Sequence, residues 1–356
     1  MLGKITKRYI SSKYPPRGNN LDRIRNIVLN STKPRASNAE RNDNASQPTS
    51  HRIPSTKVEP AETEQGGGRH LKPIIPEWIH LNETYNQHYR TATNTELNNI
   101  NHFFNTAEIK FEWSVSDFKS IPSEIVKSKF NDMENSSHSL NGKASVGINL
   151  GTQGKPKKMY PGKTSIPFEL INGLPEIAFL GRSNAGKSTI LNNLLTRLSE
   201  TKLCAAAKVS SKPGFTRTLN CFNIGNKFRL VDTPGYGYGS THSQGDLTME
   251  YLQGRDELKR CFILVSAKEG LTELDLEIMG FLQDIGRPFE VVFTKMDKVK
   301  RLEELKDGIS ESGILEYATL PKLIFTNSKT TRSCPRRYGM DLLRYTIFES
   351  CGLLRI

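Results

Sequence analysis

The chain has 356 residues, a formal net charge of +13 and 36% hydrophobic residues, which is enough for one or two folded domains. Nine basic residues and one acidic residue lie within 1–39, whereas 40–173 are neutral overall and 174–356 are mildly basic. The basicity alone is therefore no evidence of a nucleic-acid-binding surface. No apolar run approaches the ~18 residues of a transmembrane helix. The five cysteines form no CxxC pair, which argues against a disulfide framework or a zinc site and favours a reducing compartment.

The first 39 residues have the composition of a mitochondrial transit peptide. They are rich in Lys, Arg and Ser, and Leu2, Ile5 and Tyr9 fall on one helical face. A basic tail without folded structure and a nuclear address are the alternatives. We interpret residues 1–39 as a transit peptide and expect a location in the mitochondrial matrix.

Two later stretches lack the apolar residues that a folded core needs. Residues 40–75 are rich in Ser, Thr, Asn, Pro and Gly and are predicted to be a disordered linker. Residues 133–170 have a similar composition and are predicted to be a disordered insert. The segment between them, 76–132, is interpreted as an N-terminal extension of the main domain, which spans 171–356.

Part of this extension, residues 101–119, is a candidate to pack on the main domain. A helix is expected over 92–105. From Ile109 to Val115 apolar and polar residues alternate, which predicts a half-buried strand. We interpret this strand as the edge of the folded domain.

The main domain is predicted to be a three-layer α/β sandwich with a mostly parallel sheet. Apolar runs predict buried parallel strands at 176–180, 228–231, 261–265, 289–293 and 322–325. Helical spacing predicts helices at 187–199, 246–259, 272–285 and 340–350. An antiparallel edge strand is expected at 218–224.

The first of these strands leads into the sequence GRSNAGKS at 181–188, and a helical pattern follows. This order of strand, GxxxxGKS and helix is that of a phosphate-binding P-loop. The predicted sandwich is therefore of the P-loop NTPase type, with the nucleotide at the carboxyl ends of the strands. Its two glycines allow a tight turn whose N–H groups face phosphate oxygens. Lys187 would reach the β- and γ-phosphates, and Ser188 would offer its hydroxyl to Mg²⁺.

Two later motifs indicate a guanine nucleotide. The sequence DTPG at 232–235 follows a predicted strand, where its carboxylate can hold Mg²⁺ through water and its glycine N–H can reach the γ-phosphate. The sequence TKMD at 294–297 follows another predicted strand. The Asp297 carboxylate can accept hydrogen bonds from N1–H and N2–H₂ of guanine, and adenine offers neither donor. The stem of Lys295 can cover the purine face. A small-molecule kinase is therefore disfavoured.

The loop at 212–218 lies between the P-loop and the DTPG motif and is predicted to sense the γ-phosphate. Thr216 is the candidate for a second protein ligand of Mg²⁺, and Thr218 is the fallback. A turn hydroxyl without a metal role is the alternative for Thr216. The predicted Mg²⁺ ligands are thus Ser188, Thr216 and Asp232.

Together these motifs resemble the EngB/YihA-type GTPases. The resemblance rests on GRSNAGKS, the PGFT loop at 213–216, DTPGYGYG at 232–239 and TKMD, and it covers about 174–356. The resemblance implies a GTPase that acts in assembly of the large ribosomal subunit, and with the leader it implies a mitochondrial member of the family. GTP and GDP are the implied ligands, and the mitochondrial large subunit or its rRNA is the implied partner. We expect a monomer.

The predicted site includes a fifth, guanine-contacting motif around 325–328, which matches the family loosely. The sequence also departs from the family at Phe215, where Arg is usual, and at Ser266, where Asp is usual. The predicted catalytic residues are Lys187, Thr216, Gly235 and Asn184. The predicted nucleotide-binding residues are Gly181, Arg182, Ser183, Asn184, Ala185, Gly186, Lys187, Ser188, Thr189, Gly214, Thr216, Thr218, Asp232, Gly235, Thr294, Lys295, Asp297, Thr326 and Asn327.

Two positions bear on the rate of hydrolysis. Tyr236 follows the DTPG glycine where Ras-type proteins have glutamine, so hydrolysis without a partner is expected to be slow. Asn184 occupies the P-loop position that some related GTPases use to coordinate K⁺, which could then stimulate hydrolysis. A hydrogen bond that stabilises the loop is the alternative for Asn184.

The sequence therefore predicts a GTP-binding switch protein with slow, partner-stimulated hydrolysis in mitochondrial ribosome assembly or translation. A non-hydrolysing guanine-nucleotide sensor is the alternative. A GTPase of tRNA modification or of a membrane is disfavoured, because no further catalytic domain or transmembrane span is evident. One basic cluster is a candidate rRNA contact, or else a solvated charged face: Lys329, Arg332, Arg336, Arg337 and Arg344.

Overall fold

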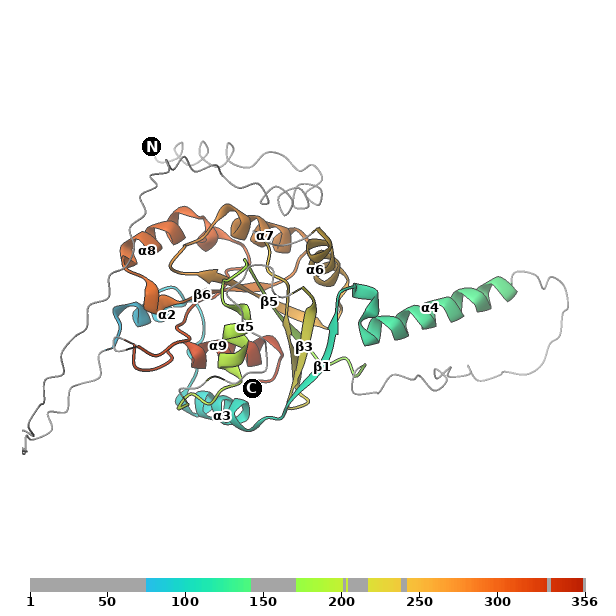
Figure 1. The fold of residues 1–356 in the computed structure, drawn as a ribbon, viewed down its shortest axis with the longest axis horizontal. Coiled ribbons are helices and arrows are strands. Elements are labelled where there is room, and N and C mark those ends of the chain that lie inside the picture. Colours follow the sequence, from blue (N-terminus) through green and yellow to red (C-terminus); the bar gives the residue numbers. More distant parts are fainter. Residues whose placement is uncertain are drawn as a thin grey trace, which may run out of the picture.

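The computed structural model describes residues 75–141, 171–200, 203, 217–237, 242–331 and 334–354. The predicted transit peptide, the linker up to residue 74 and the predicted insert from 142 to 170 lie outside these residues. Figure 1 shows a central sheet with helices on both of its faces. The predicted three-layer, mostly parallel α/β sandwich is confirmed.

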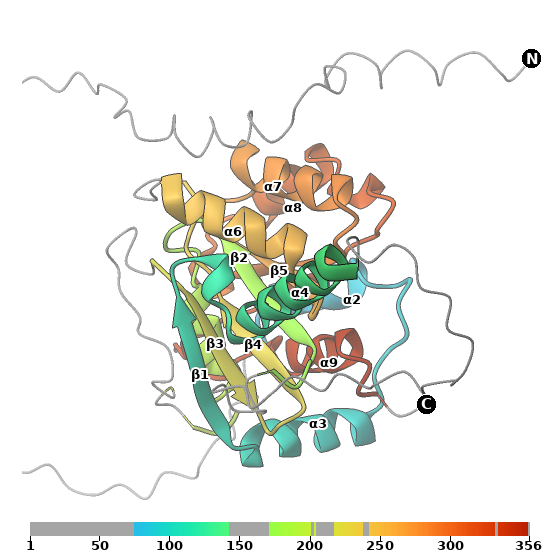
Figure 2. The same cartoon turned by 90° about the vertical axis from the view of Figure 1, so that its right-hand side faces the viewer.

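The sheet has seven strands in the order β1-β3-β4-β2-β5-β6-β7, and Figure 2 shows the first five of them side by side. β3 runs antiparallel to both β1 and β4, and all the other pairs are parallel. Every residue of β2, β4 and β6 is buried, as expected for parallel strands covered on both faces. The strands are β1 Ile109–Val115, β2 Glu176–Gly181, β3 Leu219–Ile224, β4 Phe228–Asp232, β5 Leu258–Ser266, β6 Phe289–Thr294 and β7 Leu323–Phe325.

The helices divide between the two faces and produce two apolar cores (Figure 1). Phe179 packs in one core with Ile190 and Leu191 of α5, and Ile263 packs in the other with Met279 of α7. The first face carries α3 Asn94–Thr106, α5 Lys187–Leu194 and α9 Met340–Ser350. The second carries α6 His242–Gly254, α7 Glu273–Asp284 and α8 Leu302–Glu311.

The N-terminal segment 76–132 completes the sheet at both of its edges. At one edge β1 pairs with β3. At the other edge, Asn82 of α2 (Leu81–Thr84) accepts from the Phe325 N–H at 2.8 Å and donates to the Phe325 carbonyl at 3.2 Å. Asn86 makes the same two bonds with Leu323, at 3.1 and 2.8 Å. Two side chains thus satisfy backbone groups that an edge strand otherwise leaves open.

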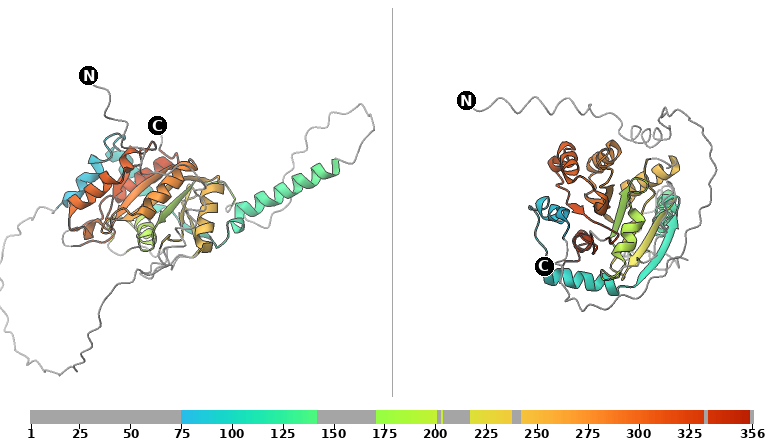
Figure 3. Two further views of the ribbon diagram at one scale, coloured as in Figure 1. Left: turned by 90° about the horizontal axis from the view of Figure 1, so that it is seen from above. Right: turned by 60° about the vertical axis from the view of Figure 1, so that its left-hand side comes forward.

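Helix α4, Pro122–Asn141, projects away from the body of the molecule (Figure 1, Figure 3). Residues 133–141 belong to this helix, so the predicted start of the insert at 133 is wrong. Only two of these nine residues are apolar, Met133 and Leu140, so the sequence shows little helical periodicity there. No helix in the described ranges is both long and apolar enough to cross a bilayer.

Four other element predictions need correction. α5 ends at Leu194 rather than 199. β3 is not an edge strand, because β1 covers it and leaves Cys221 fully buried. α6 ends at Gly254 rather than 259, since the Arg255 side chain turns into a buried ionic cluster and β5 begins at Leu258. α8 was not predicted, although Leu302, Leu305 and Ile309 have helical spacing and Leu305 and Ile309 are buried.

Candidate nucleotide-binding site

The loop between β2 and α5 is shaped by two glycines. Gly181 has φ of +150°, and a Cβ there would lie 2.6 Å from the Leu264 carbonyl oxygen of β5. Gly186 has φ of +103° and is the N-cap of α5. Because L side chains rarely adopt such angles, the loop requires glycine at these two positions. The predicted order of strand, tight loop and helix is therefore present.

Lys187 is enclosed by this loop and is only 7% exposed. Its Nζ donates hydrogen bonds to the carbonyl oxygens of Gly181 at 2.8 Å and Arg182 at 3.1 Å. Burial lowers the pKa of Lys187 to about 8, although the Asp232 carboxylate opposes this shift. A buried ammonium group held by neutral carbonyls is a receptor for an anion.

Ser188 and Asp232 meet at the adjacent ends of α5 and β4. The Ser188 hydroxyl donates to Asp232 Oδ2 at 2.7 Å, while Oδ1 is buried and has no hydrogen-bond partner among the described residues. Burial raises the pKa of Asp232, and both Lys187 and the Ser188 hydrogen bond oppose the shift. A hydroxyl and a carboxylate with an unsatisfied oxygen are hard ligands, so this pair fits Mg²⁺.

The DTPG loop lies directly against the P-loop. The Tyr236 N–H donates to the Gly181 carbonyl at 3.3 Å, and the Ser183 N–H donates to the Tyr236 carbonyl at 3.1 Å. A Cβ at Gly235 would lie 2.9 Å from Ser183 N and 3.0 Å from Lys187 Nζ. A side chain there would therefore collide with the phosphate-binding groups, which explains glycine at this position.

The remaining predicted P-loop residues line the same turn. Asn184 is exposed, with φ of 65°, and Ala185 is buried. The Ser183 hydroxyl is buried without a hydrogen-bond partner in the described part of the chain. Thr189 is half-buried in the first turn of α5. The loop thus presents its backbone and one orphaned hydroxyl toward Lys187 and the DTPG segment.

Only one of the three predicted switch-loop residues can be placed, because Gly214 and Thr216 lie outside the described residues. The Thr218 hydroxyl accepts from Ser114 at 2.8 Å and donates to Asn220 at 3.2 Å. Asn220 pairs with Asp232 across the sheet, so the chain enters β3 beside the predicted Mg²⁺ ligand. Thr216 therefore remains the predicted ligand, and Thr218 is engaged with the strand β1 segment.

The TKMD loop is attached to the P-loop by two hydrogen bonds. The Thr294 hydroxyl donates to the Ala185 carbonyl at 2.6 Å, and Lys295 Nζ donates to the Asn184 carbonyl at 2.6 Å. Lys295 has φ of 59°, and the short 3-10 helix Met296–Lys298 that follows carries the half-buried Asp297. The phosphate-binding and base-binding motifs are thus held in one arrangement.

The fifth motif differs from the expectation. Thr326 is fully buried, and its N–H donates to the Phe293 carbonyl at 2.8 Å. The Asn327 amide group donates to the carbonyls of Lys329 and Arg336, both at 2.9 Å, and its Oδ1 accepts from the Tyr338 N–H at 2.8 Å. The Asn327 side chain therefore closes its own loop, and any contact from this segment to a base falls to the main chain around 327–329.

A buried cluster behind the site was not assigned a role from the sequence. The Tyr236 hydroxyl donates to Asp275 Oδ1 at 2.9 Å, and Arg182 Nε lies 3.5 Å from Asp275 Oδ2. Asp275 also caps α7 by accepting from the Thr272 N–H at 3.0 Å. Burial raises the pKa of Tyr236 well above its ordinary value, and the Asp275 charge adds to the shift. The TxxD spacing at 272–275 was the available signal, because it is typical of a helix N-cap.

The predicted rRNA cluster is wrong for two of its five members. Arg344 is fully buried and donates to the carbonyls of Leu194 and Thr196 at 2.8 and 2.7 Å. Arg337 is 7% exposed and donates to the Asn193 side chain at 2.8 Å. Both guanidinium groups satisfy the carboxyl end of α5, where cations are favoured. Lys329 and Arg336 are exposed, and Arg332 lies outside the described residues.

The fold and this strand–loop–helix site define a P-loop nucleotide-binding domain. A family model described as 50S ribosome-binding GTPase matches residues 176–295. MIOREX complex component 8 of Saccharomyces cerevisiae is 41% identical over 283 residues, which cover 80% of this chain and 82% of that protein. The probable GTP-binding protein EngB of Caulobacter vibrioides is 35% identical over 189 residues, 50% of this chain and 76% of the relative.

The chain belongs to the EngB family of GTPases, which confirms the resemblance predicted from the motifs. A solved structure of a probable GTP-binding protein EngB covers 50% of this chain and 98% of its own length, with 22% identity and a TM-score of 0.37.

Proposed function

We propose that this protein binds GTP with Mg²⁺ and hydrolyses it slowly, as a switch in large-subunit assembly or translation in the mitochondrial matrix. The observation that carries the proposal is the contact among the P-loop, the DTPG loop and the TKMD loop at the carboxyl ends of adjacent strands. The family description, 50S ribosome-binding GTPase, supports the ribosomal partner. The acid-poor leader supports the mitochondrial location.

The phosphate end of the site supplies charge and fixed dipoles. Lys187 would exchange its two carbonyl partners for β- and γ-phosphate oxygens, which offsets the cost of burying its charge. The N-terminus of α5 adds backbone N–H groups directed at the phosphates. When bound by Ser188, Asp232 and the predicted Thr216, Mg²⁺ supplies positive charge beside the β- and γ-phosphates. The Gly235 N–H would then contact the γ-phosphate from the opposite side.

The base end of the site supplies specificity. The Asp297 carboxylate would accept from N1–H and N2–H₂ of guanine, and the Lys295 stem would cover the ring. The bond from Lys295 Nζ to the Asn184 carbonyl already fixes this stem across the P-loop. The main chain around 327–329 would complete the contacts to the base.

The side chain that follows Gly235 explains why hydrolysis would be slow. The Tyr236 hydroxyl is bound to the buried Asp275 and is not available to orient an attacking water. This observation also favours the second candidate function, a guanine-nucleotide sensor that does not hydrolyse GTP. Asn184 is the residue through which K⁺ would act, and equal hydrolysis rates in KCl and NaCl would remove that role.

Turnover in the presence of ribosomal particles separates the two functions. The full chain would be incubated with [γ-³²P]GTP, with and without purified mitochondrial large-subunit particles, alongside Lys187→Ala as the nucleotide-binding control. Release of phosphate that rises with the particles supports the switch, whereas GTP binding without turnover supports the sensor. Sucrose-gradient sedimentation of mitochondrial extract would test the partner, since a protein that stays in the soluble fractions is not a ribosomal factor.

A further inference from the structure

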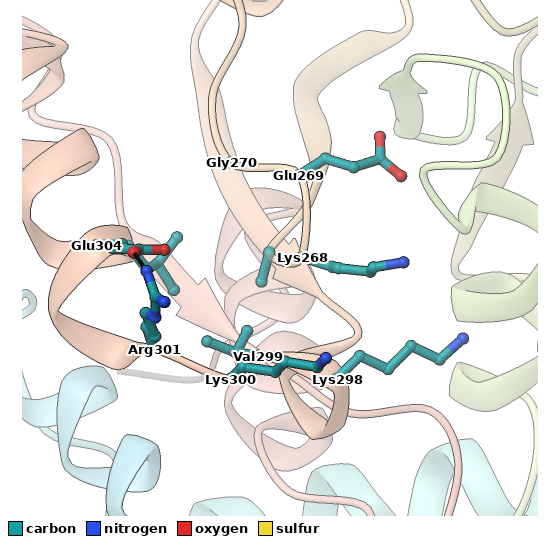
Figure 4. A pocket seen from close by; sticks show the side chains of 10 residues that line it. Lys268, Glu269, Gly270, Lys298, Val299, Lys300, Arg301 and Glu304 are labelled. Atoms are coloured by element: carbon teal, nitrogen blue, oxygen red, sulfur yellow. Dashed lines mark hydrogen bonds and ion pairs between the residues drawn. The ribbon is translucent and has the colours of Figure 1, made fainter. Parts of the chain in front are cut away.

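A hollow of about 420 Å³ lies beside the nucleotide site, on the other side of the TKMD loop. The loops that follow β5 and β6 line it together with the start of α8. Four basic side chains and two acidic ones surround it: Lys268, Lys298, Lys300, Arg301, Glu269 and Glu304 (Figure 4). No aromatic residue is among those that line it.

The two carboxylates do not neutralise the lysines. Glu304 pairs with Arg301, one turn away on the same helix. Glu269 accepts from Arg182 of the P-loop at 3.0 Å. Lys268, Lys298 and Lys300 are exposed, and within the described ranges none of them forms an ion pair. The hollow therefore carries a net positive charge that the described residues do not compensate.

Two of these lysines, Lys268 and Lys298, face the same side of the hollow, near the base-binding motif. In Figure 4 the side chains of Lys268 and Lys298 extend toward the same side, away from the pair of Arg301 and Glu304. Burial lowers the pKa of Lys295, the Glu269 charge opposes this, and the like charges of Lys298 and Lys268 lower it further. The charges of Lys268 and Lys298 therefore act on the base-binding motif.

We propose that Lys268, Lys298 and Lys300 form a binding site for the phosphate backbone of RNA. The proposal rests on the ribosomal function proposed above, and it replaces the predicted contact through Arg337 and Arg344, which are buried. Lys298 directly follows the TKMD motif, and Lys268 follows the neighbouring strand β5. RNA at this surface would therefore lie beside the guanine nucleotide. Lys268 also precedes Glu269, which accepts a hydrogen bond from Arg182 of the P-loop.

The composition of the hollow favours nucleic acid over a protein partner. The centres of protein interfaces are depleted in lysine and enriched in aromatic residues, methionine and arginine. Three lysines around a hollow without aromatic side chains have the opposite composition, which suits phosphate groups. Without a ring to stack on a base or a planar guanidinium free to read one, the contact would show little sequence preference.

The test compares the full-length protein with the triple variant Lys268→Gln, Lys298→Gln and Lys300→Gln. The probe is a fluorescein-labelled 30-nucleotide RNA hairpin, followed by anisotropy between 50 and 200 mM KCl. Each lost phosphate contact removes about 0.7–0.9 from the slope of log K against log salt, so we expect the slope to fall by about 2. At the lowest salt the affinity should fall about tenfold or more.

A matched variant, Lys129→Gln, Lys227→Gln and Lys259→Gln, removes three exposed lysines that lie away from the hollow. It loses the same net charge, so it should keep most of the RNA affinity and slope. Binding of mant-GDP should be unchanged in both variants, which also shows that they fold.

Four outcomes would overturn the proposal. The first is that the wild type does not bind the RNA, and the second is that the two triple variants lose RNA affinity equally. The third is that the variant of Lys268, Lys298 and Lys300 loses mant-GDP binding, which would assign these lysines to the nucleotide site. The fourth is that this variant keeps RNA binding and loses only binding to poly-L-glutamate, which would indicate an acidic protein partner. The ribosomal role is judged separately by sedimentation of the wild type. A protein that binds RNA through these lysines but does not sediment with ribosomal particles keeps the site and contradicts the proposed function.

Discussion

Buried charges lie at both ends of the central sheet, but their surroundings differ. At the carboxyl end, Lys187 is held by neutral carbonyls and one oxygen of Asp232 has no hydrogen-bond partner among the described residues. At the opposite end, the fully buried Glu176 accepts from Arg255 and, at 2.9 Å, from the Tyr251 hydroxyl.

The cluster around Glu176 connects segments that are distant in the sequence. Arg255 also donates to Glu124 of α4 at 2.7 Å, while Arg229 of β4 pairs with Glu112 of β1. Burial opposes the charge of Arg255, yet the hydrogen bonds and charge of Glu176 raise its pKa above the ordinary value. In this cluster the buried Glu176 and Arg255 bind each other and attach the N-terminal segment, whereas the other end of the sheet leaves its charges for a ligand.

The largest expected effect is on stability and comes from the satisfied end. Glu176→Gln would leave the Arg255 guanidinium buried without its main carboxylate, which should lower the unfolding free energy by about 3–5 kcal/mol. Urea denaturation measures this, and GDP affinity of the folded fraction should be unchanged. Glu303→Gln, which removes an exposed partner of Lys306, should change nothing measurable. Equal stability of the two variants would show that the Glu176 cluster is not structural.

The converse experiment addresses the ligand end. Lys187→Ala removes a charged donor to the phosphates and should weaken GDP and GTP binding by about 3 kcal/mol, or about 100-fold. Because the lysine is buried and forms no ion pair with a carboxylate among the described residues, the variant should be no less stable than the wild type without nucleotide. Isothermal titration and urea denaturation measure the two quantities, with the exposed Lys227→Ala as control. A large loss of stability in Lys187→Ala would show that the buried charge at the carboxyl end of the sheet also stabilises the fold, which contradicts the comparison.

The base-binding motif allows a test of specificity. In Asp297→Asn the new NH₂ group can donate a hydrogen bond to the 2-carbonyl of xanthine. In guanine it would face the N2–H₂ group, which is also a donor, so one hydrogen bond to guanine is lost. GTP affinity should fall by about 30-fold, which is about 2 kcal/mol, while XTP affinity rises. Competition against mant-GDP measures both. A variant that binds neither nucleotide better than the other would indicate that Asp297 does not contact the base.

The pH dependence of binding reports on Lys187. Its pKa is lowered to about 8 in the folded protein, so it is charged at pH 7 and mostly neutral at pH 9. Phosphates bind the charged form, so the association constant for GDP should fall about tenfold from pH 7 to 9. The stability of the protein without nucleotide changes with pH in the opposite direction. Between pH 8 and 10.5 the unfolded chain keeps the Lys187 proton and the folded protein does not, so the contribution of Lys187 to the unfolding free energy rises with pH.

Lys187→Arg is the control for this profile, because arginine stays charged across the range and the base of the nucleotide titrates equally in both proteins. If the affinities of wild type and variant fall in parallel above pH 8, Lys187 is not the titrating group.

The smallest expected effect concerns the edge of the sheet. Asn86→Ala removes both hydrogen bonds to Leu323 and should cost about 1 kcal/mol, since water can partly replace them at an edge. Asn98→Ala, an exposed asparagine of α3, is the matched control in thermal unfolding. Equal unfolding temperatures would mean that the side chain adds nothing to the edge strand.

Much of the sheet could be predicted because buried parallel strands are continuous apolar runs. Each predicted run coincides with an observed strand, and the alternation from Ile109 to Val115 correctly indicated β1. The two missed helices show two kinds of error. Only Met133 and Leu140 are apolar among the last nine residues of α4, so that part of the chain has little helical periodicity. In α8, by contrast, Leu302, Leu305 and Ile309 have helical spacing, and the prediction missed a pattern that the sequence contains.

The sequence by itself determined the nucleotide-binding motifs and the family, because a phosphate loop needs a contiguous run of glycines, lysine and serine whose order survives in the chain. Only the tertiary structure decided which charges are buried. Arg344 and Arg255 look like surface residues in the sequence, yet they contact groups 150 and 79 residues away. Burial is a property of contacts between distant segments, and no local pattern of residue types encodes it.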